Sequence, residues 1–483
     1  MSTTGVWVRR GLFGLLGLVV LLLAAVLVAL FALGIPRGAA GMAAKGVCSA
    51  AFVAGRPVEL LLAQDVLPAS PVLELIGVSV DQAQRSVTAR FAGLVSRRAV
   101  WLPDRGCVLD LQPAPASAST EVVAKAAFDA GKSWPEGDAP LVAAQWGAGV
   151  DVAALNKTIE QAFVGSGNVL AANTRGLAVV HKGRLLALRE AEGFAPGTPL
   201  HGWSMTKTVG GMLLHKLATE TQLSLDTPVV DAFAKAREPA WLAAWRADGR
   251  KAIKVSDLMY MRDGLASVED YNPWGAVPLM LWGAPDAAVF AAAVPLEAEP
   301  GKRWRYLSTS ANLMAAVARG RFDSDARYWA YPRQALFDPI GARTAVLETD
   351  SAGNWIASSY LWASTADWAR LGELLRNDGR WGPKLELQVL PPGFLKLAQT
   401  PASSSGEGRR YGAQSWLMGE PNEGSCRGKG VPEDTVSMEG HWGQLVAVVP
   451  SREAVIVRLG WTFKRGQFDA CKLVAEVLAA LPK

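Results

Sequence analysis

Residues 201–217 read HGWSMTKTVGGMLLHKL, and this stretch decides which fold we expect for the chain. Apolar residues recur along it at the spacing of one helix face: Val209, Met212, Leu213 and Leu217. The pattern predicts a helix that begins at or near Ser204, with Lys207 one turn further on. Because residues three positions apart share a helix face, the Lys207 amine can reach the Ser204 hydroxyl.

This S-x-x-K spacing suits a serine nucleophile and its base. A partly buried lysine loses proton affinity and can take the proton of the serine hydroxyl. The amino end of the helix also favours negative charge that develops beside Ser204. The motif is short enough to arise by chance, and the competing interpretation is a capping serine followed by a solvated lysine. It is the only S-x-x-K in the sequence.

Two later segments carry further candidate residues. Tyr306 ends a loop that begins with Pro-Gly and precedes a predicted helix, where its hydroxyl can relay a proton. The competing interpretation is a core aromatic residue whose hydroxyl is hydrogen-bonded.

His441 lies in Gly440-His441-Trp442-Gly443, which opens a predicted strand. Glycines there let a substrate approach the backbone, and edge amides can donate to an oxyanion.

The segments around these motifs predict an α+β unit. Residues 177–181 and 184–190 flank Lys182-Gly183, which is a strong hairpin signal, and residues 445–450 and 454–460 form a second predicted hairpin. Helical patterns cover residues 150–164 and 468–481. Strands at both ends with helices between them predict one antiparallel sheet assembled from both ends of the unit.

The order Ser-x-x-Lys, Tyr, His-x-Gly resembles the serine hydrolases of the penicillin-recognising family. That family includes class C β-lactamases, D-Ala-D-Ala carboxypeptidases, esterases and 6-aminohexanoate-dimer hydrolases. The resemblance covers residues 150–483 and implies a β-lactamase/transpeptidase-like fold, an antiparallel sheet flanked by helices with an all-helical subdomain. It also implies that Ser204 is the acylated nucleophile, Lys207 its base and Tyr306 a second proton carrier. The backbone amides of Ser204 and Gln444 would form the oxyanion hole.

Two departures from the family pattern bear on the substrate. Ser308 stands where the family has the asparagine of Tyr-x-Asn, and His441-Trp442-Gly443 stands for Lys-Thr/Ser-Gly. A neutral imidazole binds a substrate carboxylate less well than the charged amine of a lysine does. Both changes resemble the esterase and amide-hydrolase branch, so we expect a small ester or amide substrate and no metal or cofactor. The alternatives are a D,D-peptidase or β-lactamase, and an inactive relative that serves as a binding protein.

Composition excludes several other classes. Half of the 483 residues are hydrophobic and 19% are charged, which excludes a disordered chain. The net charge is +5 and no long Lys/Arg run occurs, so we expect no nucleic-acid partner. The four histidines are scattered and the four cysteines form no CxxC pair, which argues against a metal site.

The amino end predicts a membrane anchor. Residues 11–36 carry no charge and are numerous enough to cross a bilayer as a helix, after a cytoplasmic segment of residues 1–10 with Arg9 and Arg10. A cleaved signal peptide is the competing interpretation, although signal cores are usually only about 7–15 residues long. A twin-arginine export signal fits the flanking residues poorly. Either way, we expect the hydrolase unit in the periplasm or outside the cell.

Residues 37–149 predict a small module and linker without a catalytic constellation. A helical stretch over residues 57–65 and strands over 86–91 and 98–102 suit a lid or packing module, and residues 114–119 and 135–140 suit a linker. An even number of cysteines suits two disulfides. We expect one in each unit, Cys48–Cys107 and Cys426–Cys471, among the three connectivities that four cysteines allow.

Overall fold

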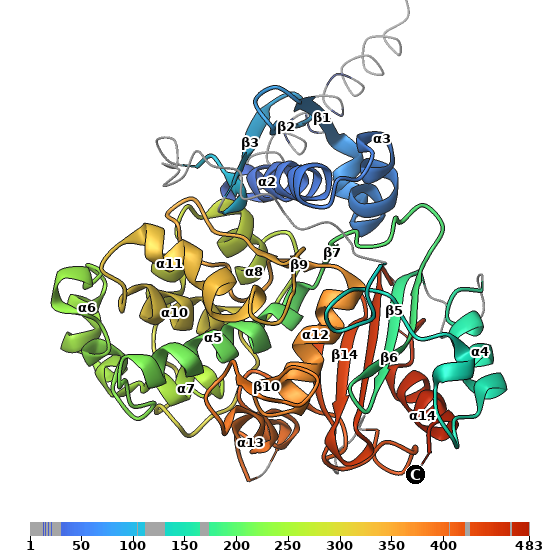
Figure 1. The fold of residues 1–483 in the computed structure, drawn as a ribbon. Helices are drawn as coiled ribbons and strands as arrows, with labels where there is room; N and C mark the ends of the chain where they lie inside the picture. The colour runs from blue at the N-terminus through green and yellow to red at the C-terminus, as the bar shows by residue number, and fades with distance from the viewer. Residues whose placement is uncertain are drawn as a thin grey trace, which may run out of the picture.

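The computed structural model describes residues 30–103, 105–111, 131–164, 173–404, 406–420, 426–463 and 466–482, together with four separate residues between 13 and 21. A six-stranded antiparallel sheet lies at its centre (Figure 1), in the order β12 (Trp416–Leu417), β13 (Val436–Gly440), β14 (Gln444–Val449), β15 (Ala454–Gly460), β5 (Thr174–His181) and β6 (Arg184–Glu190). The pairing of β15 with β5 brings the two predicted hairpins side by side, as expected from the sequence.

Helices cover both faces of this sheet, which explains why its central strands are apolar at nearly every position. On one face, α4 (Val152–Gln161) and α14 (Ala470–Ala480) pack on residues such as Leu177 and Val179. On the other face, α12 (Thr365–Arg376) packs on the alternate residues, including Val180. A Cβ at Gly372 would meet the side chains of Val455 and Val446 at 2.6 and 2.7 Å, so α12 approaches the sheet closely there.

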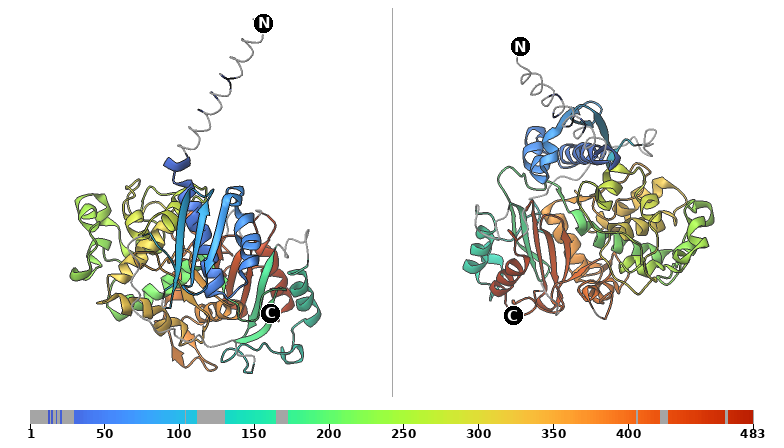
Figure 2. Two further views of the ribbon diagram at one scale, coloured as in Figure 1. Left: turned by 90° about the horizontal axis from the view of Figure 1, so that it is seen from above. Right: turned by 180° about the vertical axis from the view of Figure 1, so that it is seen from behind.

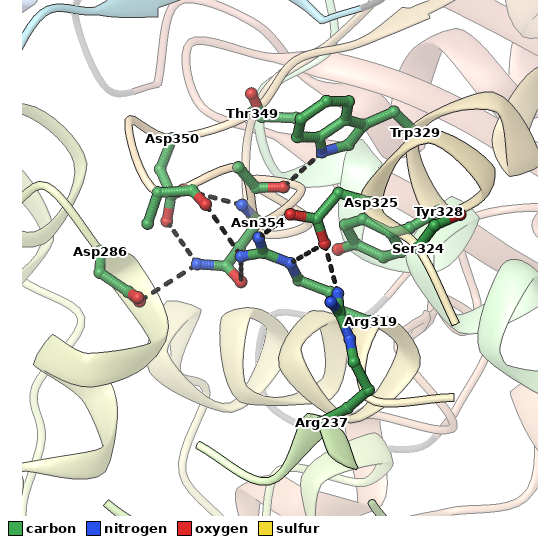
Figure 3. A network of polar contacts seen from close by, with 12 residues as sticks. Arg237, Asp286, Arg319, Ser324, Asp325, Tyr328, Trp329, Thr349, Asp350 and Asn354 are labelled. Atoms are coloured by element: carbon green, nitrogen blue, oxygen red, sulfur yellow. Dashed lines mark hydrogen bonds and ion pairs between the residues drawn. The ribbon is translucent and has the colours of Figure 1, made fainter. Parts of the chain in front are cut away.

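A mostly helical region lies beside the sheet (Figure 1) and contains α5 (Thr206–Glu220), α6 (Leu242–Ala247), α7 (Val255–Met259), α9 (Ala287–Ala292), α10 (Ser308–Arg319) and α11 (Asp325–Pro332). A polar network anchors residues 350–354 to these helices (Figure 3). Arg319 donates to the Ala352 carbonyl at 2.9 Å and to the Asn354 side chain at 3.0 Å, and it pairs with Asp325 at 2.7 Å. The network therefore fixes residues 350–354, which lie a few positions before Ser358 in the sequence.

A separate module at the amino end lies across the top of the molecule (Figures 1 and 2). It combines α2 (Ile35–Cys48) with a four-stranded antiparallel sheet of β1 (Ile76–Asp81), β2 (Ser86–Phe91), β3 (Val95–Leu102) and β4 (Gly106–Leu109). The predicted strand over residues 86–91 is confirmed, and the one over 98–102 is the second half of a longer strand. The predicted helical stretch over 57–65 holds α3 (Val58–Leu61) and the π-helical turn Leu62–Val66.

The module is joined to the rest of the protein by a buried ion pair. Lys45 of α2 lies 3.2 Å from the carboxylate of Glu348, and both side chains are almost fully buried. Ser49 donates to this carboxylate at 2.9 Å and the backbone N–H of Cys107 donates at 2.7 Å. The disulfide Cys48–Cys107 lies beside these donors and Cys426–Cys471 lies in the sheet region, as expected.

The prediction of a linker over residues 135–140 is wrong. Asp138 is buried and pairs with Arg370 of α12 at 2.8 Å, and Arg370 also donates to the Pro135 carbonyl at 3.0 Å. A buried guanidinium needs such partners, so this segment is part of the packed structure. The other predicted linker, residues 114–119, lies outside the described residues.

The prediction of a membrane anchor is also corrected. Across the described parts of the chain, no helix combines the length and apolar character that crossing a membrane requires. Residues 1–10 and most of the predicted span, residues 11–36, lie outside the described residues. The last two residues of that span, Ile35 and Pro36, begin α2 and are buried in the protein. The neighbouring apolar residues Phe31 and Leu33 of the same span are exposed.

Candidate active site

A tight turn presents Ser204 at the start of α5. The 3₁₀ turn Trp203–Met205 directly precedes this helix, as the sequence predicts. Trp203 has a φ of +49°, a conformation that costs a non-glycine residue on the order of 1–2 kcal/mol. The Thr206 hydroxyl holds the turn, because it donates to the Trp203 carbonyl at 2.6 Å and accepts from the Leu361 N–H at 3.0 Å.

Lys207 lies in contact with the Ser204 hydroxyl. Its Nζ is 3.0 Å from Ser204 Oγ, 3.0 Å from Ser308 Oγ and 2.9 Å from the Ser358 carbonyl oxygen. The amine is buried, and burial lowers the pKa of Lys207 to about 8, against the opposing effect of the Glu269 carboxylate. A substantial fraction of the amine is therefore neutral near pH 8, where it can accept the proton of Ser204.

Ser308 connects Lys207 to a carboxylate that the sequence did not indicate. Glu269 accepts from the backbone N–H and from the hydroxyl of Ser308, both at 2.7 Å. Its carboxylate lies 3.9 Å from Lys207 Nζ. Ser308 is the first residue of α10, where the helix end favours a nearby negative charge. Glu269 lies in a loop with no recognisable motif, so no local signal pointed to it.

Two tyrosines lie beside the nucleophile. Burial raises the pKa of Tyr306 well above 10, and the Ser204 hydroxyl opposes this increase as a hydrogen-bonding neighbour. Burial and the Glu269 carboxylate also raise the pKa of Tyr271, and Ser204 again acts in the opposite direction. Lys207 Nζ lies 4.9 Å from the centre of the Tyr306 ring. The sequence predicted Tyr306 at this site, whereas Tyr271 carries no motif and was missed.

His441 lies at the edge of the same site and is neutral at pH 7. Its ring stacks on Tyr271, with centroids 4.4 Å apart, and meets the Trp203 ring edge-on at 5.3 Å. Burial lowers the pKa of His441 to about 4. The histidine belongs to the turn between β13 and β14, and this turn directly precedes β14, the strand that the sequence predicted after this motif.

The glycines around His441 make room for the protein itself. A Cβ at Gly440 would meet the Gly202 carbonyl oxygen at 2.2 Å, which shows that β13 lies against the nucleophile turn. Gly443 has a φ of +83°, and a Cβ there would meet the Arg458 guanidinium at 2.7 Å. Protein atoms therefore occupy the Cβ side of both glycines, and the approach of a substrate to their backbone stays a prediction.

The side chain of Gln444 forms hydrogen bonds within the sheet, whereas the side chain of Lys207 contacts those of Ser204 and Ser308. Gln444 begins β14, an inner strand of the sheet, opposite Gly440 of β13. Its side chain donates to the His441 carbonyl at 3.1 Å and accepts from the Gly460 N–H at 2.9 Å. These bonds clamp the turn that carries His441. The oxyanion hole of the Ser204 and Gln444 amides stays a prediction.

Comparisons with known proteins agree with this architecture. The Beta-lactamase family pattern matches residues 156–479, about two thirds of the chain. A structure from Bacteroides dorei DSM 17855, assigned as a β-lactamase, has a TM-score of 0.50 and 17% identity over 68% of this chain and 97% of its own. This likeness concerns the fold, an α+β arrangement with an antiparallel sheet and helices.

Other solved structures are similar over the same part of the chain. A penicillin-binding protein homologue from Caulobacter crescentus has a TM-score of 0.48 and 17% identity, over 68% of this chain and 97% of its own. A D-stereospecific amidohydrolase from Streptomyces sp. has a TM-score of 0.47 and 15% identity, over 67% of this chain and 97% of its own. No curated protein matches the sequence.

Proposed function

The chain belongs to the Beta-lactamase family of serine hydrolases, and we propose that it cleaves a small ester or amide through an acyl-enzyme on Ser204. The observation that carries this proposal is the 3.0 Å separation between Ser204 Oγ and the buried amine of Lys207. A base needs to lie within hydrogen-bond reach of the proton it removes, and its pKa needs to lie near the working pH. Lys207 meets both conditions.

The proposed reaction proceeds in two halves. Neutral Lys207 takes the proton of Ser204 as Oγ attacks the substrate carbonyl carbon, which gives a tetrahedral oxyanion beside the start of α5. The oxyanion collapses, and the bond to the alcohol or amine breaks as that group takes a proton from Lys207, through Tyr306 or directly. Water then attacks the acyl-Ser204 ester as neutral Lys207 takes a proton from it. The bond between the acyl carbon and Ser204 Oγ breaks, Oγ receives that proton from Lys207, and the carboxylic acid leaves.

The charges around the nucleophile favour a neutral substrate. Glu269 brings a carboxylate to 3.9 Å from Lys207 and forms hydrogen bonds with Ser308, and His441 is neutral at pH 7. Neither group attracts a substrate carboxylate, which a β-lactam or a D-Ala-D-Ala peptide carries. We therefore propose an esterase or amidase rather than a β-lactamase or a D,D-peptidase. A fluorescent penicillin is expected to leave Ser204 unlabelled, and stoichiometric acylation would overturn this choice of substrate.

A fluorophosphonate probe tests the nucleophile directly. The intact protein is expected to gain one adduct mass, mapped by peptide analysis to Ser204, and to hydrolyse short p-nitrophenyl esters. Ser204→Ala is expected to lose both reactions while keeping its circular dichroism spectrum. Ser224→Ala removes a hydroxyl from an exposed serine and serves as the matched control. An adduct on Ser204→Ala would identify another nucleophile, and an inert wild-type protein would favour the inactive binding protein.

A further inference from the structure

An apolar cavity lies between the amino-end module and the proposed active site. Its volume is about 150 Å³. The module contributes Gly38 and Met42 of α2 together with Leu73, and the hydrolase part contributes Trp203, Tyr271 and His441. The module residues lie outside the segment that matches the Beta-lactamase pattern, so this wall is an addition to the family's domain.

Contacts connect the cavity to the nucleophile. Trp203 is the residue before Ser204 and shares its turn. Tyr271 stacks on His441 with ring centroids 4.4 Å apart, and Ser204 is one of the groups that affect the ionisation of its phenol. Trp203 and Tyr271 therefore connect the lining of the cavity to Ser204.

The size and chemistry of the cavity define what it can hold. An apolar cavity of about 150 Å³ is large enough to bind benzene. Its lining contains no Asp, Glu, Lys or Arg, and it is formed by aromatic and aliphatic residues with Ser70 and His441 as polar members. A charged or strongly hydrated group would lose solvation there without a partner, whereas a phenyl-sized apolar group would gain burial.

We propose that this cavity is a substrate-specificity subsite, which takes a phenyl-sized apolar group of the ester or amide and whose outer wall is the amino-end module. The inference rests on the proposed function, because it places the cavity beside an acylated Ser204. The module is then part of the substrate-binding machinery and determines which esters or amides are cleaved fastest.

Two glycines of α2 offer a matched test. A Cβ added at Gly38 would meet only the Pro273 carbonyl oxygen, at 3.9 Å, so a larger side chain can enter the cavity from this position. A Cβ added at Gly46 of the same helix would meet nothing within 4 Å, and Gly46 does not line the cavity. Gly38→Leu fills the subsite, and Gly46→Leu makes the same change on the same helix away from it.

The experiment measures kcat/KM for two ester series on the full chain. One series varies the acyl group from acetyl to phenylacetyl with a methyl alcohol part, and the other varies the alcohol from methyl to benzyl with an acetyl group. In at least one series, the wild-type protein is expected to prefer the phenyl-bearing ester by tenfold or more. Gly38→Leu is expected to lose most of that preference. Gly46→Leu is expected to keep the preference.

Fluorophosphonate labelling of Ser204 separates failure of this inference from failure of the proposed function. If the wild-type protein and Gly38→Leu are both labelled, but the ratio of phenyl-bearing to small esters is the same in both, the subsite is overturned and the hydrolase stands. If the wild-type protein is neither labelled nor active on any ester, both the proposed function and the subsite are contradicted. An equal loss of preference in Gly46→Leu would also overturn the subsite, because the effect would then belong to the helix.

Discussion

Glu269 places a carboxylate oxygen 3.9 Å from Lys207 Nζ, and Ser308 donates its hydroxyl to that same oxygen. The contact makes the base of the proposed reaction one member of a charged pair. Burial lowers the pKa of Lys207, and the Glu269 carboxylate partly opposes that effect because it stabilises the protonated amine. The pH at which Lys207 becomes a base therefore depends on a residue 62 positions further along the chain.

Replacement of Glu269 by glutamine is expected to shift the pH dependence of kcat/KM to lower pH. Glu269→Gln keeps an acceptor for Ser308 and removes the charge, so Lys207 loses its proton more readily. A charge at about 4 Å is worth about 1 kcal/mol in water and about 4 kcal/mol near a protein surface, so the profile is expected to move by about one to three pH units. Glu297→Gln, which removes an exposed carboxylate bonded to Arg303 and Arg305, is the control. A profile that shifts to higher pH, or stays in place, would contradict the pairing.

For the wild-type protein, kcat/KM is expected to rise with pH through about 8. The pKa of Lys207 is lowered to about 8, and the amine can accept a proton only when it is neutral, so the reactive form is the one present above that pKa. Lys207→Arg is expected to be nearly as inactive as Lys207→Ala, since a guanidinium does not give up its proton in this range. Initial rates between pH 5 and 10 provide the measurement. Substantial activity in Lys207→Arg would assign the lysine a purely electrostatic role.

Replacing each of the two tyrosines beside Ser204 by phenylalanine is expected to lower kcat to a different extent. Tyr306→Phe removes the predicted second proton carrier and should lower kcat by about 10²–10⁴-fold. Tyr271→Phe keeps the ring that stacks on His441 and should change kcat less than tenfold. Single-turnover acylation by a fluorogenic ester measures the proton-transfer step in both variants. The reverse order would transfer the proton-relay role from Tyr306 to Tyr271.

Loss of the ion pair between module and hydrolase is expected to destabilise the protein strongly. Lys45→Met leaves the Glu348 carboxylate buried without its cationic partner, which typically costs about 3–5 kcal/mol of unfolding free energy. The double variant Lys45→Met/Glu348→Gln should recover more than half of that loss, because no unpaired charge remains and the amide oxygen of glutamine can still accept a hydrogen bond from Ser49 or the Cys107 N–H. Urea unfolding at pH 7 gives the free energies. A loss below about 1 kcal/mol in Lys45→Met would mean that the pair contributes little to holding the module.

Local sequence patterns predicted the elements that depend on near neighbours. The period of the apolar residues after Ser204 predicted α5, and its spacing predicted the contact between Ser204 and Lys207, since a helix turn alone brings residues three apart together. Turn residues such as Lys182-Gly183 predicted the hairpin of β5 and β6. The resemblance to the penicillin-recognising family implied that Tyr306 and Ser308 join this site.

The membrane prediction shows where composition misleads. An apolar pattern is the same whether lipid, protein or water surrounds it: Ile35 and Pro36 at its end are packed inside the protein, whereas Phe31 and Leu33 are exposed. The glycines around His441 show a similar limit of a local pattern. A glycine pattern indicates that something approaches the backbone, and only the folded chain shows that Gly202 and Arg458 are what approaches.

By itself, the sequence determined the α+β class, the strands that pair as hairpins, and the contact within one helix turn between the candidate nucleophile Ser204 and its candidate base Lys207. The tertiary structure decided that Glu269 and Tyr271 join the site, that Glu348 anchors a module whose Ser49 is 299 positions away, and that the module closes an apolar cavity beside Ser204. The physical reason is the range of the interactions. Periodicity and spacing report contacts within a few residues, whereas burial of a carboxylate or the walls of a cavity depend on segments that only the packed core brings together.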